Sequence, residues 1–384
     1  MARRLIGLDI GTNAVTVAEI EAGDVPTLRA FGQVALPPDA MREGEVVDEA
    51  AVTEAIQRLW REVGLRKGAV RVGLASPRVI VRPVELPTMS EDDLAGALRF
   101  QAQELIPIPV DEAVLDFQVL ETVPGQEPGA STSRVLLAAA HRETVDRLVR
   151  AVRGAGLDVD AVDLVPLALV RSLGRRVTGD GEGAEAFVSI GAGVTVVVVH
   201  EAGLPRFVRI LGVGGRSLTE AVARDLDVAF DTAEALKRQT AGDGLAEQAR
   251  LAMERPLSVL LEEVRGSLDF YRSQADSLPL LRVLLTGGTA RLPGLEERLR
   301  RLVDVPVEQA DPRSTLVIGD IGFTGDEFEQ LDPFLPVAVG LALGGLAAGR
   351  RINLLGAAAR RRADRRGCSP PPSPWPPSSP CWAG

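Results

Sequence analysis

The sequence predicts an α/β protein with two related lobes, and two observations support this fold class. First, an apolar run of strand type ends in glycine in residues 5–12 and again in residues 187–195, and a second strand is expected behind each turn, over residues 14–20 and 194–200. Second, strand and helix patterns alternate along the rest of the chain. With 384 residues and 46% hydrophobic content, the chain is long enough to give each lobe its own core.

The two glycine turns indicate a phosphate-binding device that is used twice. A glycine at the tip of a turn lets backbone N–H groups approach an anion, because no Cβ stands in the way. One such turn would be weak support, since Gly11-Thr12 and Gly191-Ala192-Gly193 are also ordinary hairpin residues. Two turns in related lobes suggest a nucleotide whose phosphates are held between them.

The remaining elements follow from the same periodicities. In the first half of the chain we expect a helix at 52–63, strands at 70–75 and 135–140, a helix at 142–154 and a connecting helix at 164–173. In the second half we expect helices at 217–239, 257–276 and 293–302, together with a strand at 284–289. The apolar stripes of the second-lobe helices are interpreted as core.

Two glycine-rich segments strengthen the nucleotide interpretation. The strand at 284–289 ends in a glycine pair, against which a flat base or ribose could lie. Residues 211–219 lead into a helical stretch in which Glu234 and Lys237 lie one turn apart on one face. Near an adenosine, this pair could bind ribose hydroxyls and a base edge. The alternative is a solvated ion pair, which is the commoner fate of charges at this spacing.

Charge and cysteine content exclude several classes of function. The formal net charge is −10, but seven arginines and one aspartate after residue 349 contribute +6, which leaves −16 on residues 1–349. An acidic body argues against nucleic-acid binding. Both cysteines, Cys368 and Cys381, lie in the last residues, so the body has neither a disulfide framework nor a cysteine metal site.

No segment of the sequence predicts export or a membrane span. Residues 1–4 lead directly into a strand that Asp9 and Gly11 soon interrupt, so no signal peptide is expected and the protein is predicted to be cytoplasmic. Residues 334–348 are apolar throughout, but a span needs about 20 such residues. We interpret this run as a buried helix whose small residues allow close approach of neighbouring backbone.

The order of these segments resembles the actin-like ATPase superfamily: a first phosphate turn, a connecting region, a second phosphate turn, an adenosine strand and a late small-residue helix. Within it, residues 3–349 are most similar to the PilM family of type IV pilus assembly proteins, relatives of the division protein FtsA. The most specific part is residues 79–87, 94–109 and 115–117, which lie where PilM and FtsA proteins carry an inserted subdomain.

The resemblance implies an actin-like two-lobe fold, made of duplicated RNase-H-like domains, with the inserted subdomain in the first lobe. The expected ranges are 1–172 for the first lobe, about 79–163 for the inserted subdomain within it, 173–332 for the second lobe, 333–349 for an inter-lobe helix that returns to the first lobe, and 350–384 for a basic and then Pro/Ser-rich tail. The last 18 residues hold seven prolines and four serines and are expected to be disordered.

The resemblance also implies a site for ATP or ADP with Mg²⁺. Asp9 would hold the metal through water, the first turn would surround the outer phosphates, and the second would close from the other side. An alternative for Asp9 is a turn aspartate that caps its own hairpin. The implied binding residues are Asp9, Gly11, Thr12, Asn13, Ser189, Gly191, Ala192, Gly193, Gly214, Gly215, Glu234, Lys237, Gly287, Gly288 and Thr289.

One residue departs from the family pattern. Ser189 stands where an aspartate is usual in the second phosphate strand. A hydroxyl can donate to a phosphate, but it cannot act as a base or hold Mg²⁺ by charge. We therefore predict a nucleotide-binding protein with slow or undetectable hydrolysis, and assign no catalytic residue.

Three functional classes are compatible with the sequence. In the favoured one, the protein is a scaffold of the type IV pilus inner-membrane assembly complex, and ATP sets the angle between its lobes. The second is an FtsA-like membrane-associated filament protein. FtsA relatives usually end in an amphipathic membrane helix, whereas this C-terminus is arginine-rich and then proline-rich. The third is a small-molecule kinase of the same superfamily, for which we find no compelling carboxylate as general base.

Membership of the PilM family implies a partner. PilM proteins bind the cytoplasmic N-terminal peptide of the inner-membrane protein PilN, which carries an Ile-Asn-Leu-Leu-Pro motif, in a groove between the inserted subdomain and the first lobe. The candidate wall residues are Arg82, Leu94, Leu98, Phe100 and Ile106, and the alternative for each is ordinary subdomain core or surface. Contacts with other pilus alignment-complex proteins, peripheral association with the inner face of the membrane, and homo-oligomers are also expected.

The C-terminal region contains an unexpected copy of the partner's motif. Residues 352–355 read Ile-Asn-Leu-Leu. Either Ile352, Leu354 and Leu355 fasten the end of the preceding helix, or they occupy the PilN groove of their own or a neighbouring molecule. In the second case, the arginines that follow would lie against acidic phospholipid.

Overall fold

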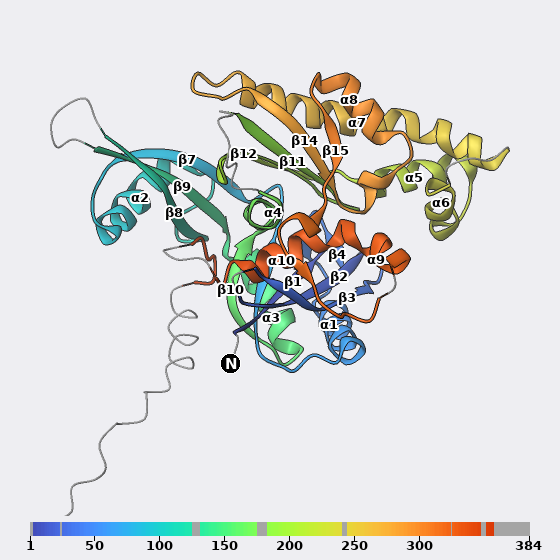
Figure 1. Cartoon of the computed structure of the whole chain (residues 1–384), viewed down its shortest axis with the longest axis horizontal. Coiled ribbons are helices and arrows are strands. Elements are labelled where there is room, and N and C mark those ends of the chain that lie inside the picture. The colour runs from blue at the N-terminus through green and yellow to red at the C-terminus, as the bar shows by residue number, and fades with distance from the viewer. Residues whose placement is uncertain are drawn as a thin grey trace, which may run out of the picture.

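The computed structural model describes residues 3–23, 25–124, 131–174, 183–239, 244–323, 325–346 and 351–356. Each of two lobes is built around one large β-sheet, and a smaller sheet stands beside them (Figure 1). The predictions made for residues 357–384, which include the Pro/Ser-rich stretch and both cysteines, lie outside the described residues.

The first lobe contains a six-stranded sheet in the order β10-β6-β1-β2-β3-β16. Its strands are β1 (Arg4–Ile10), β2 (Ala14–Glu21), β3 (Thr27–Ala35), β6 (Ala69–Leu74), β10 (Asp158–Leu164) and β16 (Val317–Ile318), with the short pair β4 (Met41–Arg42) and β5 (Glu45–Val46) nearby. The first three strands form an antiparallel meander, whereas β6 and β10 run parallel to β1. Helices α1 (Glu49–Val63) and α3 (Arg142–Gly154) pack against each other beside this sheet.

Helix α1 has clear local signals at both ends. The Asp48 carboxylate accepts hydrogen bonds from the backbone N–H groups of Ala50 and Ala51, which is an N-cap. Gly64 ends the helix with φ of 72°, a conformation that glycine adopts without steric cost. The sequence therefore specifies this helix locally as well as through its buried face.

The inserted subdomain is a three-stranded antiparallel sheet in the order β7-β9-β8, packed against helix α2. Its elements are β7 (Ile80–Pro87), α2 (Glu91–Leu105), β8 (Ala113–Pro124) and β9 (Ser131–His141). The expected end at residue 163 is too late. Helix α3 packs on α1, and β10 joins the first-lobe sheet beside β6, because both bury apolar faces in the first-lobe core.

The second lobe repeats the arrangement with a five-stranded sheet in the order β13-β12-β11-β14-β15. Its strands are β11 (Ala184–Ile190), β12 (Thr195–Glu201), β13 (Leu204–Leu211), β14 (Leu280–Thr286) and β15 (Val307–Gln309). Its helical elements are α5 (Gly215–Leu226), α6 (Phe230–Lys237), α7 (Leu245–Arg272), the 3₁₀ turn η1 (Gly288–Arg291) and α8 (Leu295–Val303). The single helix expected at 217–239 is divided, because Asp227 adopts a left-handed conformation with φ of 53°.

Two apolar helices lie where the lobes meet. Helix α4 (Val165–Leu173) packs against β12, and α10 (Leu335–Leu343) packs against α4, β1 and β2. A Cβ at Gly7 would clash with the backbone of Ala338, and one at Gly340 would clash with the backbone of Ala168. Small residues therefore allow the backbones to touch, as expected for this run. Helix α9 (Gly325–Leu331), η2 (Pro312–Ser314) and η3 (Asp332–Phe334) connect α10 to the second lobe.

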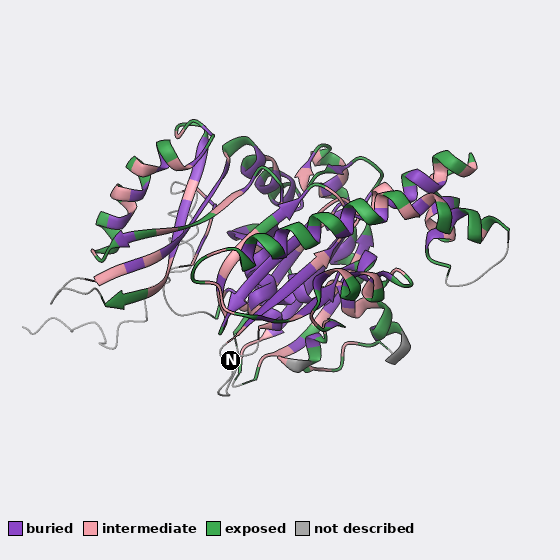
Figure 2. Cartoon of the chain, turned by 90° about the horizontal axis from the view of Figure 1, so that it is seen from above, coloured by how far each residue is buried: buried purple, intermediate pink, exposed green. Residues whose placement is uncertain are grey.

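The burial pattern separates core from surface cleanly. The central strands are buried, whereas the outer helices expose the faces turned away from them (Figure 2). Among the described residues, no helix is both long enough and apolar enough to cross a bilayer.

Residues 351–356 dock on the first lobe of their own chain. Ile352, Leu354 and Leu355 are buried in the first-lobe core, and the Leu354 N–H donates to the Val162 carbonyl of β10 at 2.7 Å. The Asn353 N–H donates to the Asp116 carboxylate of β8 at 2.7 Å. This segment therefore lies between the edge of the first-lobe sheet and the inserted subdomain.

Candidate functional site

The two glycine turns are closed by the same backbone hydrogen bond. The Gly11 N–H donates to the Ala14 carbonyl at 2.9 Å, and the Gly191 N–H donates to the Val194 carbonyl at the same distance. Each turn joins two neighbouring antiparallel strands inside its own sheet, β1 to β2 in the first lobe and β11 to β12 in the second. The structure thus contains the two matched hairpins that the sequence indicated.

The turns face each other across the lobe interface. A Cβ at Gly193 would lie 2.5 Å from the Thr12 hydroxyl oxygen, so only glycine allows this approach. In this contact, the first lobe contributes the side chain of Thr12 and the second lobe contributes the backbone of Gly193. The two glycine turns are therefore adjacent in space although about 180 residues separate them in the chain.

Helix α5 begins directly against the second turn. The Gly215 N–H donates to the Gly191 carbonyl at 2.9 Å, and the Arg216 N–H donates to the Ala192 carbonyl at 2.7 Å. A Cβ at Gly214 would meet the Gly191 carbonyl oxygen at 2.5 Å. The helix N-terminus, whose partial positive charge favours anions, thus lies beside the turn proposed to hold phosphate.

The glycine pair after β14 joins the same group. Gly287 has φ of 88°, and a Cβ there would lie 2.5 Å from the Ile190 carbonyl oxygen. The Thr289 hydroxyl donates to the Gly191 carbonyl at 2.9 Å, while Gly288 faces the ring of Phe334. These residues close the second-lobe side of the site.

The predicted carboxylate–ammonium pair exists and is tightly held. Lys237 Nζ donates to Glu234 Oε2 at 2.6 Å, to the Thr219 hydroxyl at 2.9 Å and to the Gly215 carbonyl at 3.2 Å. Burial lowers the pKa of the Lys237 ammonium, which is 7% exposed. Burial also acts on Glu234, but its hydrogen bonds from Lys237 and Thr219 outweigh that effect and lower the pKa of its carboxyl. The solvated ion pair considered as an alternative does not describe this lysine.

Asp9 and Ser189 occupy matching positions in the two lobes. Each lies two residues before its turn glycine, and each pairs with the neighbouring strand of its hairpin, at Thr16 and Val196 respectively. Burial raises the pKa of the Asp9 carboxyl from 3.8 to about 6. A half-buried carboxylate two residues before the first glycine turn fits the hard cation that the fold implies, since a nearby cation favours the charged form.

The geometry adds three residues that the sequence interpretation did not assign to the site. Arg216 donates to the Asp39 carboxylate at 2.8 Å, an ion pair that links the second lobe to the first. Thr219 bridges Glu234 and Lys237 one helical turn after Gly215. Spacing along α5 offered a signal for Thr219, whereas Asp39 is 177 residues from its partner and gave none. No group of three or more metal-binding side chains occurs within the described ranges.

The candidate partner residues divide into core and surface. Leu94 and Leu98 are each 2% exposed inside the subdomain core, so they are wrong as groove-lining residues. Arg82 is exposed, and Phe100 is 79% exposed. Phe100 and the largely buried Ile106 line an open concavity of about 900 Å³ on α2 and the loop that follows it. Helical spacing could not separate the two faces of α2, because α2 is only weakly amphipathic.

Two sheets of related topology, a matched hairpin in each and a helix pair between them define the actin-like ATPase fold. The family model described as "Type IV pilus assembly protein PilM" matches residues 7–346, so the chain belongs to this family. A solved chain described as "PilM-PilN type IV pilus biogenesis complex" is 31% identical, with a TM-score of 0.80, and the match covers 90% of this chain and 100% of the other.

More distant similarities agree with this fold. The cell division protein FtsA of Pseudomonas aeruginosa is 25% identical over 388 residues, covering 90% of this chain and 89% of FtsA. The ethanolamine utilization protein EutJ from Carboxydothermus hydrogenoformans is 17% identical with a TM-score of 0.53, and the match covers 89% of both chains. At this identity, EutJ supports the fold alone.

Proposed function

We propose that this protein is an ATP-binding scaffold of the type IV pilus inner-membrane assembly complex, and that it binds the N-terminal peptide of a PilN-type membrane protein. It would act in the cytoplasm, at the inner face of the membrane, through its partners. The approach of Gly193 to Thr12 carries the nucleotide part, because it brings two phosphate turns together at one point. The similarity to a chain of the PilM–PilN complex supports the partner.

The residues present fit a Mg²⁺-nucleotide. Backbone N–H groups of the turns and the N-terminus of α5 would bind the phosphates. Asp9 would hold the metal through water, and the metal would supply positive charge against the phosphate oxygens. Glu234 and Lys237 would face the ribose and base. Because Ser189 cannot take a proton as an aspartate can, the nucleotide would be held with slow hydrolysis or none.

The nucleotide proposal can be tested by titrating the full chain with a fluorescent ATP analogue, with and without Mg²⁺. We expect saturable binding that weakens when Mg²⁺ is removed, and weaker binding still for Lys237→Met. Glu308→Gln, a second-lobe charge change at an exposed site, is a suitable control. Absence of saturable binding by a folded chain would contradict the proposal.

The partner proposal has a separate test. A labelled peptide with the N-terminal sequence of the PilN-type protein from the same organism should bind the full chain, and a scrambled peptide should not. The segment 351–356 lies between the first lobe and the inserted subdomain, the location implied for the PilN groove. Binding of the peptide at that groove would require this segment to move.

An FtsA-like filament protein is the second candidate, favoured by the FtsA relatives. Sedimentation of the full chain with Mg-ATP separates the two functions. A filament protein pellets in a nucleotide-dependent way, whereas a scaffold stays in the supernatant.

A further inference from the structure

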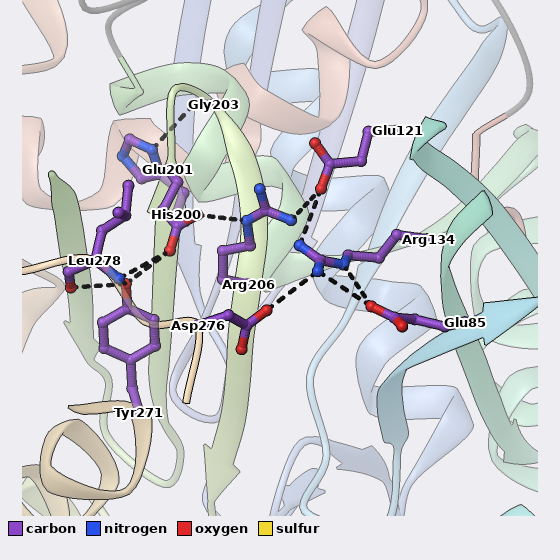
Figure 3. Close-up of polar contacts among 10 residues, drawn as sticks. All are labelled: Glu85, Glu121, Arg134, His200, Glu201, Gly203, Arg206, Tyr271, Asp276 and Leu278. Carbon is purple, nitrogen blue, oxygen red and sulfur yellow. Dashed lines mark hydrogen bonds and ion pairs between the residues drawn. The ribbon is translucent and has the colours of Figure 1, made fainter. Parts of the chain in front are cut away.

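A polar bridge connects the inserted subdomain to the second lobe. Arg206 of β13 donates through Nη1 to Glu121 Oε1 of β8 at 2.6 Å (Figure 3). Arg134 of β9 donates to the same Glu121 oxygen at 3.0 Å and to Asp276 of the second lobe at 3.1 Å. Two contacts therefore cross between the subdomain and the lobe, and Glu121 is shared between the two arginines.

Arg206 and Glu121, which form a contact between the second lobe and the subdomain, both lie at β-bulges. Between β8 and β9 the register moves from Val119 directly to Glu121, which leaves the intervening residue unpaired. Between β12 and β13, Val199 pairs with Phe207 and His200 pairs with Pro205, so Arg206 has no paired residue on β12. A bulge bends its strand and turns a side chain toward a new direction. Two independent bulges thus place opposite charges at one point, so the backbone of both strands positions this ion pair.

The bridge continues into the core of the second lobe. Arg206 Nε donates to Glu201 Oε2 at 2.7 Å, and Glu201 Oε1 accepts from the Tyr271 hydroxyl at 2.8 Å. Tyr271, on α7, is fully buried. The side chains of Arg206 and Glu201 are only 16% and 10% exposed. The chain of contacts is thus held firmly at its second-lobe end, and movement of that lobe would be transmitted to Glu121.

The same strands connect the bridge to the nucleotide turn. Strand β12 begins at Thr195, directly behind the second phosphate turn, and ends at Glu201 in the bridge. Strand β13 runs back from the bridge to Leu211, just before Gly214 and α5. Thus one two-stranded ribbon, roughly 20 Å long, has the candidate phosphate site at one end and the subdomain contact at the other.

We propose that the Arg206–Glu121 bridge couples nucleotide occupancy between the lobes to the position of the inserted subdomain. Closure of the second turn on a nucleotide moves the β12–β13 ribbon as a unit, and the bridge carries that movement to β8. Strand β8 also carries Asp116, which holds Asn353 of the C-terminal segment, so the movement reaches the surface proposed for the partner. By reciprocity, the partner and the nucleotide change each other's affinity by the same factor. This inference rests on the proposed function.

Hydrogen exchange tests the coupling without the partner. Exchange of β8 and β9 amides is measured in the full chain with and without Mg-ATP, for the unmodified protein, Glu121→Gln and Arg206→Gln. We expect nucleotide to slow exchange in these strands of the unmodified protein and to have no such effect in either variant. Arg209→Gln is the matched control, because Arg209 lies on β13 and pairs with Glu263 inside the second lobe; it should respond like the unmodified protein.

Peptide affinity gives a second readout. With saturating Mg-ATP, the affinity of the unmodified chain for the PilN-type peptide should change by about fivefold or more, and this factor should fall to about one in both bridge variants. Nucleotide binding that persists with an undiminished β8–β9 response in folded Glu121→Gln and Arg206→Gln overturns the coupling and leaves the proposed function intact. An unmodified chain that binds no nucleotide overturns the proposed function and the coupling together.

Discussion

The Thr12 side chain faces the Gly193 backbone so closely that a Cβ at Gly193 would lie 2.5 Å from the Thr12 hydroxyl oxygen. This contact joins the glycine turn of the first lobe to that of the second. Because Gly193 has no Cβ, the residues of the two glycine turns can lie next to each other at the candidate site.

Gly193→Val should hold the turns apart and weaken nucleotide binding by roughly tenfold, about 1.4 kcal/mol, because a branched side chain fills the approach to Thr12. The measurement is the affinity for a fluorescent ATP analogue. Gly68→Ala is the matched control, since a Cβ there meets nothing within 4 Å. Equal affinities for the Gly193 variant and the unmodified chain would show that the turns need not approach each other in the bound state.

Asp9→Asn should stabilise the nucleotide-free protein at neutral pH. The folded protein holds the Asp9 proton more tightly than the unfolded chain does, with a pKa of about 6 against 3.8. Charging this carboxyl therefore costs folding free energy that grows as the pH rises from about 4 to 6, and reaches about 3 kcal/mol above that range. Urea unfolding at pH 4 and pH 7.5 should show the variant more stable than the unmodified chain only at the higher pH.

Asp9→Asn, which should stabilise the nucleotide-free protein, should impair the binding of Mg²⁺ with the nucleotide. Without the carboxylate, the variant should lose the dependence of nucleotide binding on Mg²⁺. For the unmodified chain, Mg²⁺-dependent binding should weaken as the pH falls through about 6, because the proton competes with the cation at Asp9. If the variant binds Mg-ATP with unchanged affinity and unchanged Mg²⁺ dependence, Asp9 does not hold the metal and only caps its own hairpin.

Ser189→Asp should increase phosphate release by at least about tenfold, within the range that a positioned acid–base group contributes. Ser189 matches Asp9 in its position before the turn, so an aspartate there would point at the same junction. Phosphate release is measured at saturating Mg-ATP, with Ser189→Ala as the control. A fast rate in the unmodified chain would contradict the expectation of slow hydrolysis.

A chain that ends at Gly349 should bind the PilN-type peptide more tightly than the full chain if residues 352–355 occupy the same groove. A tethered competitor acts at an effective concentration of about millimolar, enough to weaken a micromolar peptide. The truncation should also lower stability, by about 1.5–3 kcal/mol for each apolar side chain removed from the core, so folding is checked first by circular dichroism. If the truncated chain is folded and binds the peptide with the same affinity as the full chain, residues 352–355 are a structural plug and do not compete with the peptide.

A point variant separates these effects within the full chain. The Asn353 side-chain oxygen accepts from the N–H groups of Val162 and Leu355, at 3.1 and 2.9 Å. Asn353→Ala should therefore loosen the segment while leaving its apolar side chains in place. Under the competitor hypothesis the peptide affinity rises in this variant, and under the plug hypothesis only the free energy of unfolding falls.

The sequence alone determined the fold class, the two glycine turns and the pairing of Glu234 with Lys237. These features are local, because strand periodicity, glycine at a turn and side chains three residues apart on a helix each depend on a few neighbouring residues. The actin-like fold and the pilus family were recognisable for the same reason, since their order of short segments survives in the chain.

Tertiary structure alone decided the rest. Whether Leu94 faces the core or a partner, and whether 142–163 belongs to the insertion or to the first lobe, depend on which surfaces pack together. Arg206 and Glu121 are 85 residues apart in the sequence. No local sequence pattern predicts that a bulge in each strand will bring their side chains together. Contacts between distant segments are set by sheet register and lobe packing, which local propensity does not encode.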